Sequence, residues 1–566
     1  MRFVGNAILT ASLCAVALPG PSRGQSVAGT SIEHPKSAAG PYQISGVVVD
    51  SKSGSPLHGV DMVITPVGAA RNGVAKTTAE DGSFVFDGLP AGKYRVVASR
   101  RGYVTSAYQE HQGFSTAIVT GPGLETSHLR FQIVPAAILS GSVIDDEGDP
   151  VPGAMVTLFR QNPANGSNSI MHAATTTTDD AGAFEFTRLA SGTIFIAASA
   201  RPWYAFHPQQ RRPGDPAQPN QEPLRSPLDV AYPTTFYADT TDSSAATPIA
   251  LRAGDHPQIT LALHPVPAVQ LRLKIPQPPA DSNEAPVRGF APPTLSQTAF
   301  GTTEIMIPTT STMIATGDQR YFEISGLAQG QYALEFHGEN GQTQGTSEIN
   351  LSTDQLLDNS NLAAGAEVKG SIAMAFGARA PEDLSVSLAP ANDRTRAGGQ
   401  KVSDRGAFAF HDVAPGLYEL FVTGGGRQLP VLQIRTMGRT IEGGRIQIGT
   451  DAVTLQADVA MGTATITGFA EQNGQRLGGA MIVLVPHNPG PNPNLFRRDQ
   501  SDSDGSFTLQ RVVPGRYTLI AIEDGWELEW AREGALQKYL SHGKPVEIRG
   551  DATKVDLPDP VAVQAP

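Results

Sequence analysis

The chain has 566 residues and a net charge of −12, and only 17% of its residues are charged. An acidic balance disfavours binding to nucleic acid and to anionic membranes, whereas few charges together with 59 Gly and 44 Pro are typical of an ordered, turn-rich protein. Because a domain usually takes roughly 100–200 residues, the length predicts several domains.

The first 24 residues have the pattern of a secretory signal peptide. Arg2 precedes an apolar run from Ile8 to Leu18, and Ser22 and Gly24 are the small residues expected before a cleavage site at Gln25. We therefore expect a secreted protein located in the periplasm, at the outer-membrane surface or outside the cell. No later apolar run reaches the length of a membrane-spanning helix, so no transmembrane segment is expected in the mature chain.

Residues 25–43 are rich in Ser, Gly and Ala and are predicted to be a flexible linker. The pattern that organises the rest of the chain is clearest just after Asp81. Counted from Gly82, it places aromatic, apolar and turn residues at fixed positions: Phe84, Phe86, Leu89, Gly92 and Tyr94. Alternating strand residues share a face, and both Asp-Gly and Leu-Pro-Ala-Gly are turn sequences. The pattern thus predicts a strand, a tight turn and a return strand with the aromatic residues in the core.

The same pattern returns four more times, near residues 182, 320, 406 and 505. The copy near 320 lacks the leading glycine because Arg320 stands there. The copies lie about one domain length apart, too far for a solenoid repeat. We therefore predict five domains, namely domain 1 (44–137), domain 2 with a Pro-rich insert (138–267), a divergent domain 3 (268–365), domain 4 (366–462) and domain 5 (463–566).

Strands also precede and follow each copy. A strand containing a glycine, such as Gly46 or Gly141, opens the domain, and two further strands close it, as in 247–254 and 259–263. About seven strands per domain predict an all-β fold of tandem antiparallel sandwiches. The stretch from Trp526 to Ser541 is the exception, because its apolar spacing predicts a short helix in the last domain.

Two motifs together resemble the carboxypeptidase regulatory-like domain. They are Gly46-Val47-Val48-Val49-Asp50 with its following Gly54-Ser55-Pro56 turn, and Asp81-Gly82-Ser83-Phe84-Val85-Phe86 with Leu89-Pro90-Ala91-Gly92-Lys93-Tyr94. The match is strongest in domains 1, 2 and 5 and weakest in domain 3. The resemblance implies a transthyretin-like, seven-stranded Greek-key sandwich, related in shape to carbohydrate-binding folds, in an extracytoplasmic setting. It implies no catalysis, because in that family this domain accompanies a zinc peptidase and is not itself the enzyme.

No constellation in the sequence predicts catalysis, a metal site or a cofactor. The twelve His residues are scattered, and no His-Glu-x-x-His spacing occurs. The acidic stretch 499–505 suggests a calcium loop, but Gln500 and Arg511 stand at positions where the loop needs ligands, which favours a plain acidic turn. Cys14 is the only cysteine and lies in the predicted signal peptide, so no disulfide is expected in the mature chain.

The three Trp residues all lie outside the repeated pattern. Trp203 stands beside Tyr204 in the domain 2 insert, and Trp526 and Trp530 lie four apart in domain 5. As exposed rings, these four would be ligand-binding residues on which sugars stack; as buried rings, they would cap a sandwich or join neighbouring domains. For Trp526 and Trp530 the sequence favours burial.

These observations predict a secreted, non-enzymatic binding or structural protein of the cell envelope. Two alternatives remain open: a carbohydrate-binding protein that uses the aromatic inserts, and an accessory component of a peptidase or an outer-membrane transport system. Polysaccharides or envelope proteins are the expected partners, nucleic acid is not, and a monomer is expected. Short linkers predict a semi-rigid chain that would reach about 150–200 Å if the domains lay end to end.

Overall fold

The computed structural model describes residues 40–566, except 70–72, 163–165, 167–168, 208–225, 276–292, 302, 308, 317–318, 338–342, 359–365, 391–399, 404–405, 414, 489–492 and 533. The predicted signal peptide and most of the predicted linker therefore lie outside the described residues. Strands dominate the structure, as the sequence predicts, and the one α-helix in the described part is α1 (Gln537–Leu540).

Domain 1 is a sandwich of two sheets. The first has the order β4-β1-β8, and the second has the order β3-β2-β5, with both β6 and β7 on the far edge of β5. Its strands are β1 (Tyr42–Asp50), β2 (Asp61–Pro66), β3 (Val74–Thr77), β4 (Ser83–Leu89), β5 (Gly92–Ser99), β6 (Ser106–Ala107), β7 (Ile118–Thr120) and β8 (Leu129–Ile133).

Domain 2 repeats this arrangement with sheets β12-β9-β17 and β11-β10-β13, the latter extended by β15 and β16, while β14 pairs with β18 beside them. Its elements are β9 (Ala137–Asp145), β10 (Met155–Asn162), β11 (Ser169–Thr177), β12 (Ala183–Leu189), β13 (Gly192–Ser199), β14 (Val230–Ala231), β15 (Thr235–Phe236), η2 (Ser243–Ala245), β16 (Ile249–Leu251), β17 (Gln258–Leu263) and β18 (Val266–Pro267).

Domain 3 has two four-stranded sheets, β22-β23-β19-β26 and β21-β20-β24-β25. The divergent copy of the sequence pattern thus still forms a two-sheet sandwich in the described residues. Its strands are β19 (Val269–Lys274), β20 (Thr294–Ala299), β21 (Thr303–Met306), β22 (Thr310–Thr316), β23 (Gln319–Leu327), β24 (Gly330–His337), β25 (Thr343–Leu351) and β26 (Gln355–Asp358).

Domain 4 has sheets β30-β27-β36-β33-β34 and β29-β28-β31-β32, with β35 also paired to β31. Its elements are β27 (Ala366–Met374), η4 (Ala375–Gly377), β28 (Ser385–Pro390), β29 (Gln400–Lys401), β30 (Ala407–Val413), β31 (Gly416–Gly424), β32 (Arg427–Leu429), β33 (Val431–Thr436), β34 (Arg439–Glu442), β35 (Arg445–Ile448) and β36 (Val453–Val459).

Domain 5 differs because its two sheets are joined. The final strand β45, which the sequence analysis did not predict, pairs with both β37 and β42 and links them. The elements are β37 (Ala464–Gln472), β38 (Gln475–Arg476), β39 (Met481–Pro486), η6 (Pro493–Leu495), β40 (Arg497–Gln500), β41 (Ser506–Val512), β42 (Gly515–Ile522), η7 (Gly525–Glu527), α1, β43 (Lys544–Ile548), β44 (Lys554–Asp556) and β45 (Val561–Gln564).

Two details of the predicted fold need correction. The sandwiches are not purely antiparallel, because in each domain a late strand runs parallel to the first: β1 with β8, β9 with β17, β19 with β26, β27 with β36 and β37 with β44. The other sheet of the domain supplies the crossover that a parallel pair requires. The stretch from Trp526 to Ser541 is not one helix either, since only η7 and α1 form and the chain between them is irregular.

The residues of the repeated pattern form the cores, as predicted. Phe84 and Phe86 in domain 1 and their counterparts Phe184 and Phe186 in domain 2 are all buried. The Tyr at the last position closes the turn before its strand: Tyr94 donates to the Pro90 carbonyl (3.0 Å), and Tyr332 and Tyr517 donate in the same way to Ala328 (2.6 Å) and Val513 (2.8 Å). Burial raises the pKa of Tyr332 and of Tyr517 to about 12.

The opening glycine and the first Phe of the pattern form a cross-strand pair. Gly141 lies opposite Phe184, and the same pairing joins Gly370 with Phe408. A Cβ added to Gly370 would lie 2.1 Å from Phe408 Cζ, so the ring occupies the space that a side chain would need. In domain 3, where the glycine is missing, Leu273 faces Phe322.

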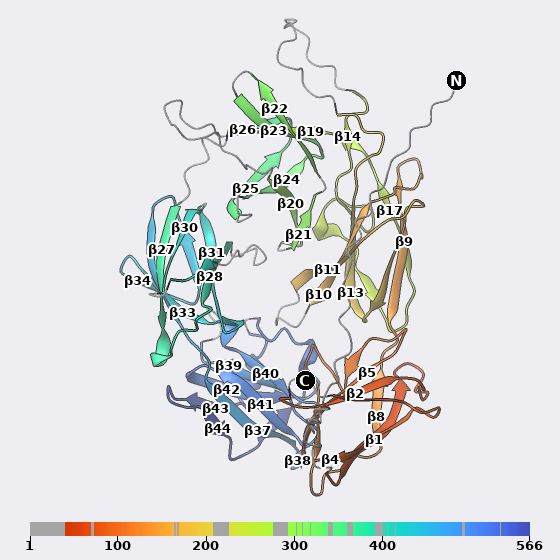
Figure 1. Ribbon diagram of the computed structural model, residues 1–566, viewed down its shortest axis with the longest axis vertical. Helices are drawn as coiled ribbons and strands as arrows, with labels where there is room; N and C mark the ends of the chain where they lie inside the picture. Colours follow the sequence, from red (N-terminus) through yellow and green to blue (C-terminus); the bar gives the residue numbers. More distant parts are fainter. Residues whose placement is uncertain are drawn as a thin grey trace, which may run out of the picture.

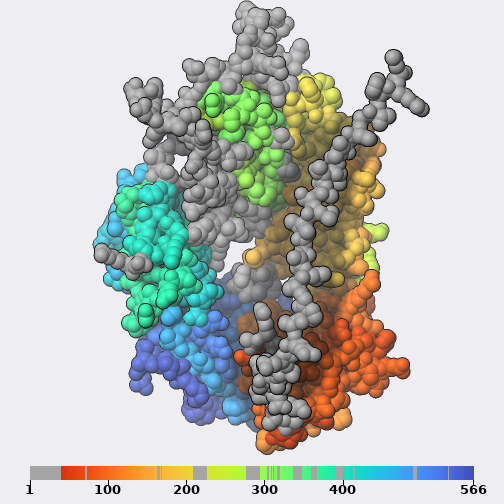
Figure 2. All heavy atoms as spheres, viewed as in Figure 1, coloured from red at the N-terminus to blue at the C-terminus, as the bar shows by residue number. Residues whose placement is uncertain are grey.

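The five domains do not lie end to end. Figure 1 shows the chain passing through domains 2, 3 and 4 and returning, so that domain 5 (blue) lies beside domain 1 (red), and Figure 2 shows an opening near the centre of this arrangement. The extended arrangement expected from the short linkers is therefore wrong. Packing between domains 1 and 5 holds the first and last domains together.

Candidate functional site

The acidic turn before β41 contacts domain 1 directly. Lys93 Nζ on β5 lies 2.6 Å from Asp502 Oδ2, and the other oxygen of Asp502 accepts a hydrogen bond from the Ala117 amide (3.0 Å). The next residue continues the contact, because the Ser503 amide donates to the Ala117 carbonyl (3.0 Å) and its hydroxyl accepts from the Val119 amide (2.9 Å). We call this contact between domains 1 and 5 the seam.

Gln500 at the end of β40 is the polar centre of the seam. Its side chain is buried, and its amide nitrogen donates to the Gln109 carbonyl (2.6 Å) and to Thr116 Oγ1 (2.7 Å). Its amide oxygen lies 3.2 Å from His111 Nδ1. An uncharged side chain buried between domains with all of these partners aligns the two surfaces specifically, since a misplaced partner would leave a buried polar group unsatisfied.

Aromatic rings form the apolar part of the seam. The Trp526 ring stacks on the His111 ring at 5.2 Å with only 7° between their planes, and Phe114 packs 5.8 Å away. The Arg498 guanidinium lies over the rings of both Phe114 (5.0 Å) and Trp530 (4.5 Å). Burial lowers the pKa of Arg498 to about 10, so the group remains a cation at neutral pH and the two rings stabilise its charge.

A hairpin of domain 2 reaches the same region. The Ala531 amide donates to the Gly166 carbonyl at 2.9 Å. A Cβ added to Gly166 would lie 2.6 Å from the Trp530 ring, and Gly166 also has a φ of +76°, so this close approach requires glycine. Domain 5 is thus held by domains 1 and 2 together.

The structure separates the four aromatic residues that the sequence singled out. Trp526 is only 3% exposed, and it packs with Leu536 and Tyr539 in a cluster on the outer side of β39 and β42, as the expectation of burial requires. Trp203, by contrast, is 85% exposed, and Tyr204 lies beside it with their rings perpendicular and 5.8 Å apart. Of these four residues, Trp203 and Tyr204 are therefore the pair that a ligand could still reach.

The acidic stretch 499–505 is used in protein contacts. Asp502 pairs with Lys93, and Asp504 accepts hydrogen bonds from the amide of Ser506 (2.9 Å) and from its hydroxyl (2.5 Å). Among the described residues, no group of three or more His, Cys, Asp or Glu side chains is placed to hold a metal ion. The same part of the chain contains no helix that is long and apolar enough to cross a membrane.

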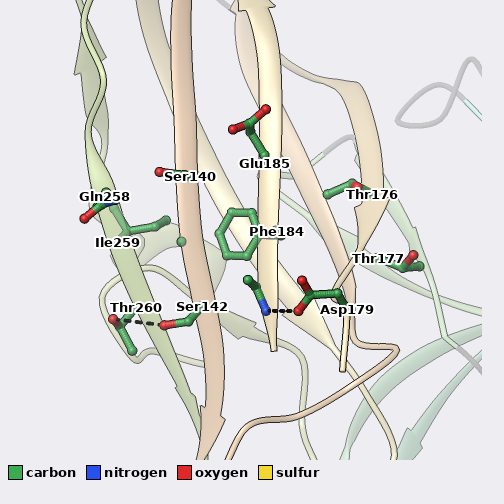
Figure 3. A pocket seen from close by; sticks show the side chains of 12 residues that line it. Ser140, Ser142, Thr176, Thr177, Asp179, Phe184, Glu185, Gln258, Ile259 and Thr260 are labelled. Carbon is green, nitrogen blue, oxygen red and sulfur yellow. Dashed lines mark hydrogen bonds between the residues drawn. The ribbon is translucent and has the colours of Figure 1, made fainter. Parts of the chain in front are cut away.

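The described surface contains grooves of several hundred Å³. One of about 700 Å³ lies on domain 2, where Ser140 is the cross-strand partner of Glu185 and, further along, the Ser142 and Thr260 hydroxyls face each other (Figure 3). A second, of about 560 Å³, runs along the seam beside His111. A third, of about 730 Å³, lies between domains 2 and 3.

Sequence reasoning did not find the seam. Its domain 1 side is the loop between β6 and β7, which includes Gln109, His111 and Phe114, and no repeated pattern covers that loop. On the domain 5 side, the sequence analysis considered the stretch 499–505 only as a calcium loop or an acidic turn, and it did not consider Arg498. The one available signal was Gln500, a polar residue at the end of a strand. Its partner Gln109 lies 391 positions away in the sequence.

The fold and the seam together define a tandem β-sandwich protein whose first and last domains are joined. Residues 43–122 and 138–217 match the model of the carboxypeptidase regulatory-like domain, and the chain carries tandem copies of this domain. The family match covers domain 1 and the first part of domain 2.

Several solved structures match the chain at low similarity. The TIE protein of Bacillus anthracis is 10% identical, with 74% of this chain and 73% of that chain covered and a TM-score of 0.18. The minor pilin GBS52 of Streptococcus agalactiae is 14% identical over 42% of this chain and 99% of its own, with a TM-score of 0.20. A streptococcal ancillary pilin is 11% identical over 51% and 98%, also with a TM-score of 0.20. No protein with a curated description matches the sequence.

Proposed function

We propose that this chain is a secreted, non-enzymatic structural protein of the cell envelope, in which five β-sandwich domains close into a ring. The observation that carries the proposal is the seam, where Lys93 pairs with Asp502 and Arg498 lies between Phe114 and Trp530. A chain that served only to span distance would gain nothing from joining its two ends. Closure instead holds five surfaces in fixed positions, which suits a scaffold that presents binding surfaces to other envelope components.

The first test concerns location and processing. We would express the full chain in a Gram-negative host and separate the cell fractions. The expected product begins at Gln25 and is found outside the cytoplasm. A product that keeps residues 1–24 and stays in the cytoplasm would contradict the envelope role.

The second test concerns the scaffold. Limited proteolysis should leave the mature chain uncut between domains, whereas the charge reversal Lys93→Glu should expose cleavage sites near the seam. The matched control is Lys401→Glu, since Lys401 is an exposed lysine on β29 of domain 4 and makes no ion pair with a described residue. Equal cleavage of all three proteins would argue against a closed scaffold.

A second candidate function, carbohydrate binding, is favoured by one observation. Trp203 is exposed over most of its surface and stands next to Tyr204, and flat exposed rings are the side chains on which sugar faces stack. Trp203→Ala should then abolish retention of the mature chain on an insoluble polysaccharide. Unchanged retention would rule out this pair as the contact.

A further inference from the structure

The groove between domains 2 and 3 has walls from both domains. Thr234, Phe236 and Ser243 come from the end of domain 2, while Gln297, Gln329 and Gln331 come from β20 and from the start of β24 in domain 3. Its volume of about 730 Å³ is within the range of ligand sites in proteins, which commonly lie between domains. We call it the domain 2–3 groove.

The two walls are fixed relative to each other. The Phe300 ring from domain 3 packs against three rings of domain 2, at 5.3 Å from Phe159, 4.9 Å from Phe195 and 5.6 Å from Phe236. The Phe300 amide also donates to Ser243 Oγ at 2.9 Å. Because this contact holds the groove in shape before any ligand arrives, binding would lose little free energy to ordering of the walls.

The groove offers free amide groups above an apolar floor. Pro233, Val266 and Pro267 form the accessible part of this floor, whereas Phe236, Ala299 and Ile305 also line the groove but are almost fully buried. In the described structure, the side-chain amides of Gln297, Gln329 and Gln331 make no hydrogen bond, and all three line the opening. Each amide carries two donor hydrogens and one acceptor oxygen, so it can donate a hydrogen bond to one hydroxyl group and accept a hydrogen bond from another.

The groove carries almost no charge. Asp242 is the one ionisable side chain among the described residues that line it, and its carboxylate already accepts hydrogen bonds from the amide and the hydroxyl of Ser244, each at 2.8 Å. An anionic ligand would lose its hydration without meeting a cation, and the one carboxylate that a cationic ligand would meet is exposed and already accepts two hydrogen bonds. The chemistry therefore favours a neutral molecule with many hydroxyl groups and with apolar faces for the floor.

We propose that the domain 2–3 groove binds a neutral oligosaccharide. The amides would contact sugar hydroxyls, and the floor formed by Pro233, Val266 and Pro267 would pack against the C–H faces of the rings. This inference goes beyond the scaffold role, and it depends on the contact between domains 2 and 3 rather than on the seam. Opening the seam should therefore leave binding intact, so the two proposals fail separately.

The test is calorimetric titration of the mature chain with defined probes. The neutral probes are cellohexaose, xylohexaose, maltohexaose and mannohexaose, the anionic probe is hexagalacturonate, and a Ser- and Gln-rich peptide stands for a protein ligand. At least one neutral hexasaccharide should bind with a Kd below about 1 mM, a range typical of weak specific binding. Gln329→Ala with Gln331→Ala should weaken this binding about tenfold, because two hydrogen bonds are lost.

Two further variants complete the test. Thr298→Trp should block the groove, and Gln447→Ala, at an exposed glutamine on β35 of domain 4, should bind like the unmodified chain. All substituted residues are exposed, and an unchanged melting temperature shows that each variant is folded. The proposal is overturned if no neutral hexasaccharide binds, if only the anionic probe or the peptide binds, or if Trp203→Ala abolishes binding that the groove variants leave unchanged.

Discussion

Lys93 Nζ lies 2.6 Å from Asp502 Oδ2, although 409 positions separate the two residues in the sequence. Both side chains are largely shielded from water by the contact between domains 1 and 5. Burial raises the pKa of Asp502, and the hydrogen bond and charge of Lys93 act in the opposite direction. The interaction with Lys93 therefore offsets part of the free-energy cost of burying the Asp502 carboxylate in the seam.

Removing the lysine alone should be more damaging than removing both charges. Lys93→Met leaves Asp502 as a buried carboxylate without its cation, so we expect a loss of about 1–3 kcal/mol in the stability of the closed form. The double variant Lys93→Met with Asp502→Asn should recover part of that loss. Denaturant titration of the unmodified chain, the two single variants and the double variant measures the coupling free energy between Lys93 and Asp502. Additive effects of the two substitutions would contradict a direct pair.

A pH dependence is expected from Asp499 in β40. Burial raises its pKa from 3.8 to about 6, while the Thr508 amide, which donates to its carboxylate at 2.7 Å, lowers it. The folded state therefore binds the proton more tightly than the unfolded state. This tighter proton binding stabilises the folded state fully below pH 3.8, and the stabilisation is lost as the pH rises through 6.

Asp499→Asn should remove this dependence while keeping an acceptor for the Thr508 amide. Above pH 6 we expect the variant to be more stable than the unmodified chain by about 1–3 kcal/mol, with the difference vanishing near pH 4. Chemical denaturation at a series of pH values from 4 to 8 gives this difference directly. A variant that is less stable at every pH would show that the ionised carboxylate contributes favourably.

The glycine opposite the first Phe should not tolerate a side chain. A Cβ at Gly370 would lie 2.1 Å from Phe408 Cζ, so Gly370→Ala should destabilise domain 4 by about 1–3 kcal/mol. Phe408→Leu shortens the ring side chain, and the double variant should be more stable than the sum of the single effects predicts. Leu273 opposite Phe322 in domain 3 shows that another pairing is possible when the strands adjust.

Fluorescence should separate the three Trp residues. Trp203 is exposed, Trp526 is buried and Trp530 is half-buried beneath Arg498. Trp203→Phe should remove most of the emission that iodide quenches, and Trp526→Phe should remove mainly blue-shifted, unquenched emission. Strong quenching in the Trp203→Phe variant would mean that the seam opens in solution.

The fold could be predicted because its signals are local. Turn glycines and alternating aromatic residues within a few positions of Gly82 determine one hairpin, and the same signals recur in every domain. The parallel pairing of β1 with β8 was missed because it depends on how distant strands meet. β45 was missed because Val561–Gln564 is too short to be separated from a C-terminal tail.

The candidate sites were harder to predict because they form between domains. The sequence favours burial for Trp526 but does not indicate its partners, which are His111 and Phe114 from domain 1. The domain 2–3 groove likewise brings Gln297 and Gln331 next to Thr234, a juxtaposition that no periodic pattern encodes.

The most direct test of the closed ring is a distance between its ends. Because Cys14 is the only cysteine and lies in the predicted signal peptide, Cys residues introduced at Thr105 in domain 1 and Glu527 in domain 5 would carry the only two spin labels. Pulsed electron paramagnetic resonance should give one short, narrow distance distribution, which Lys93→Glu broadens. A broad distribution of long distances in the unmodified background, as expected for domains extended over about 150–200 Å, would contradict closure.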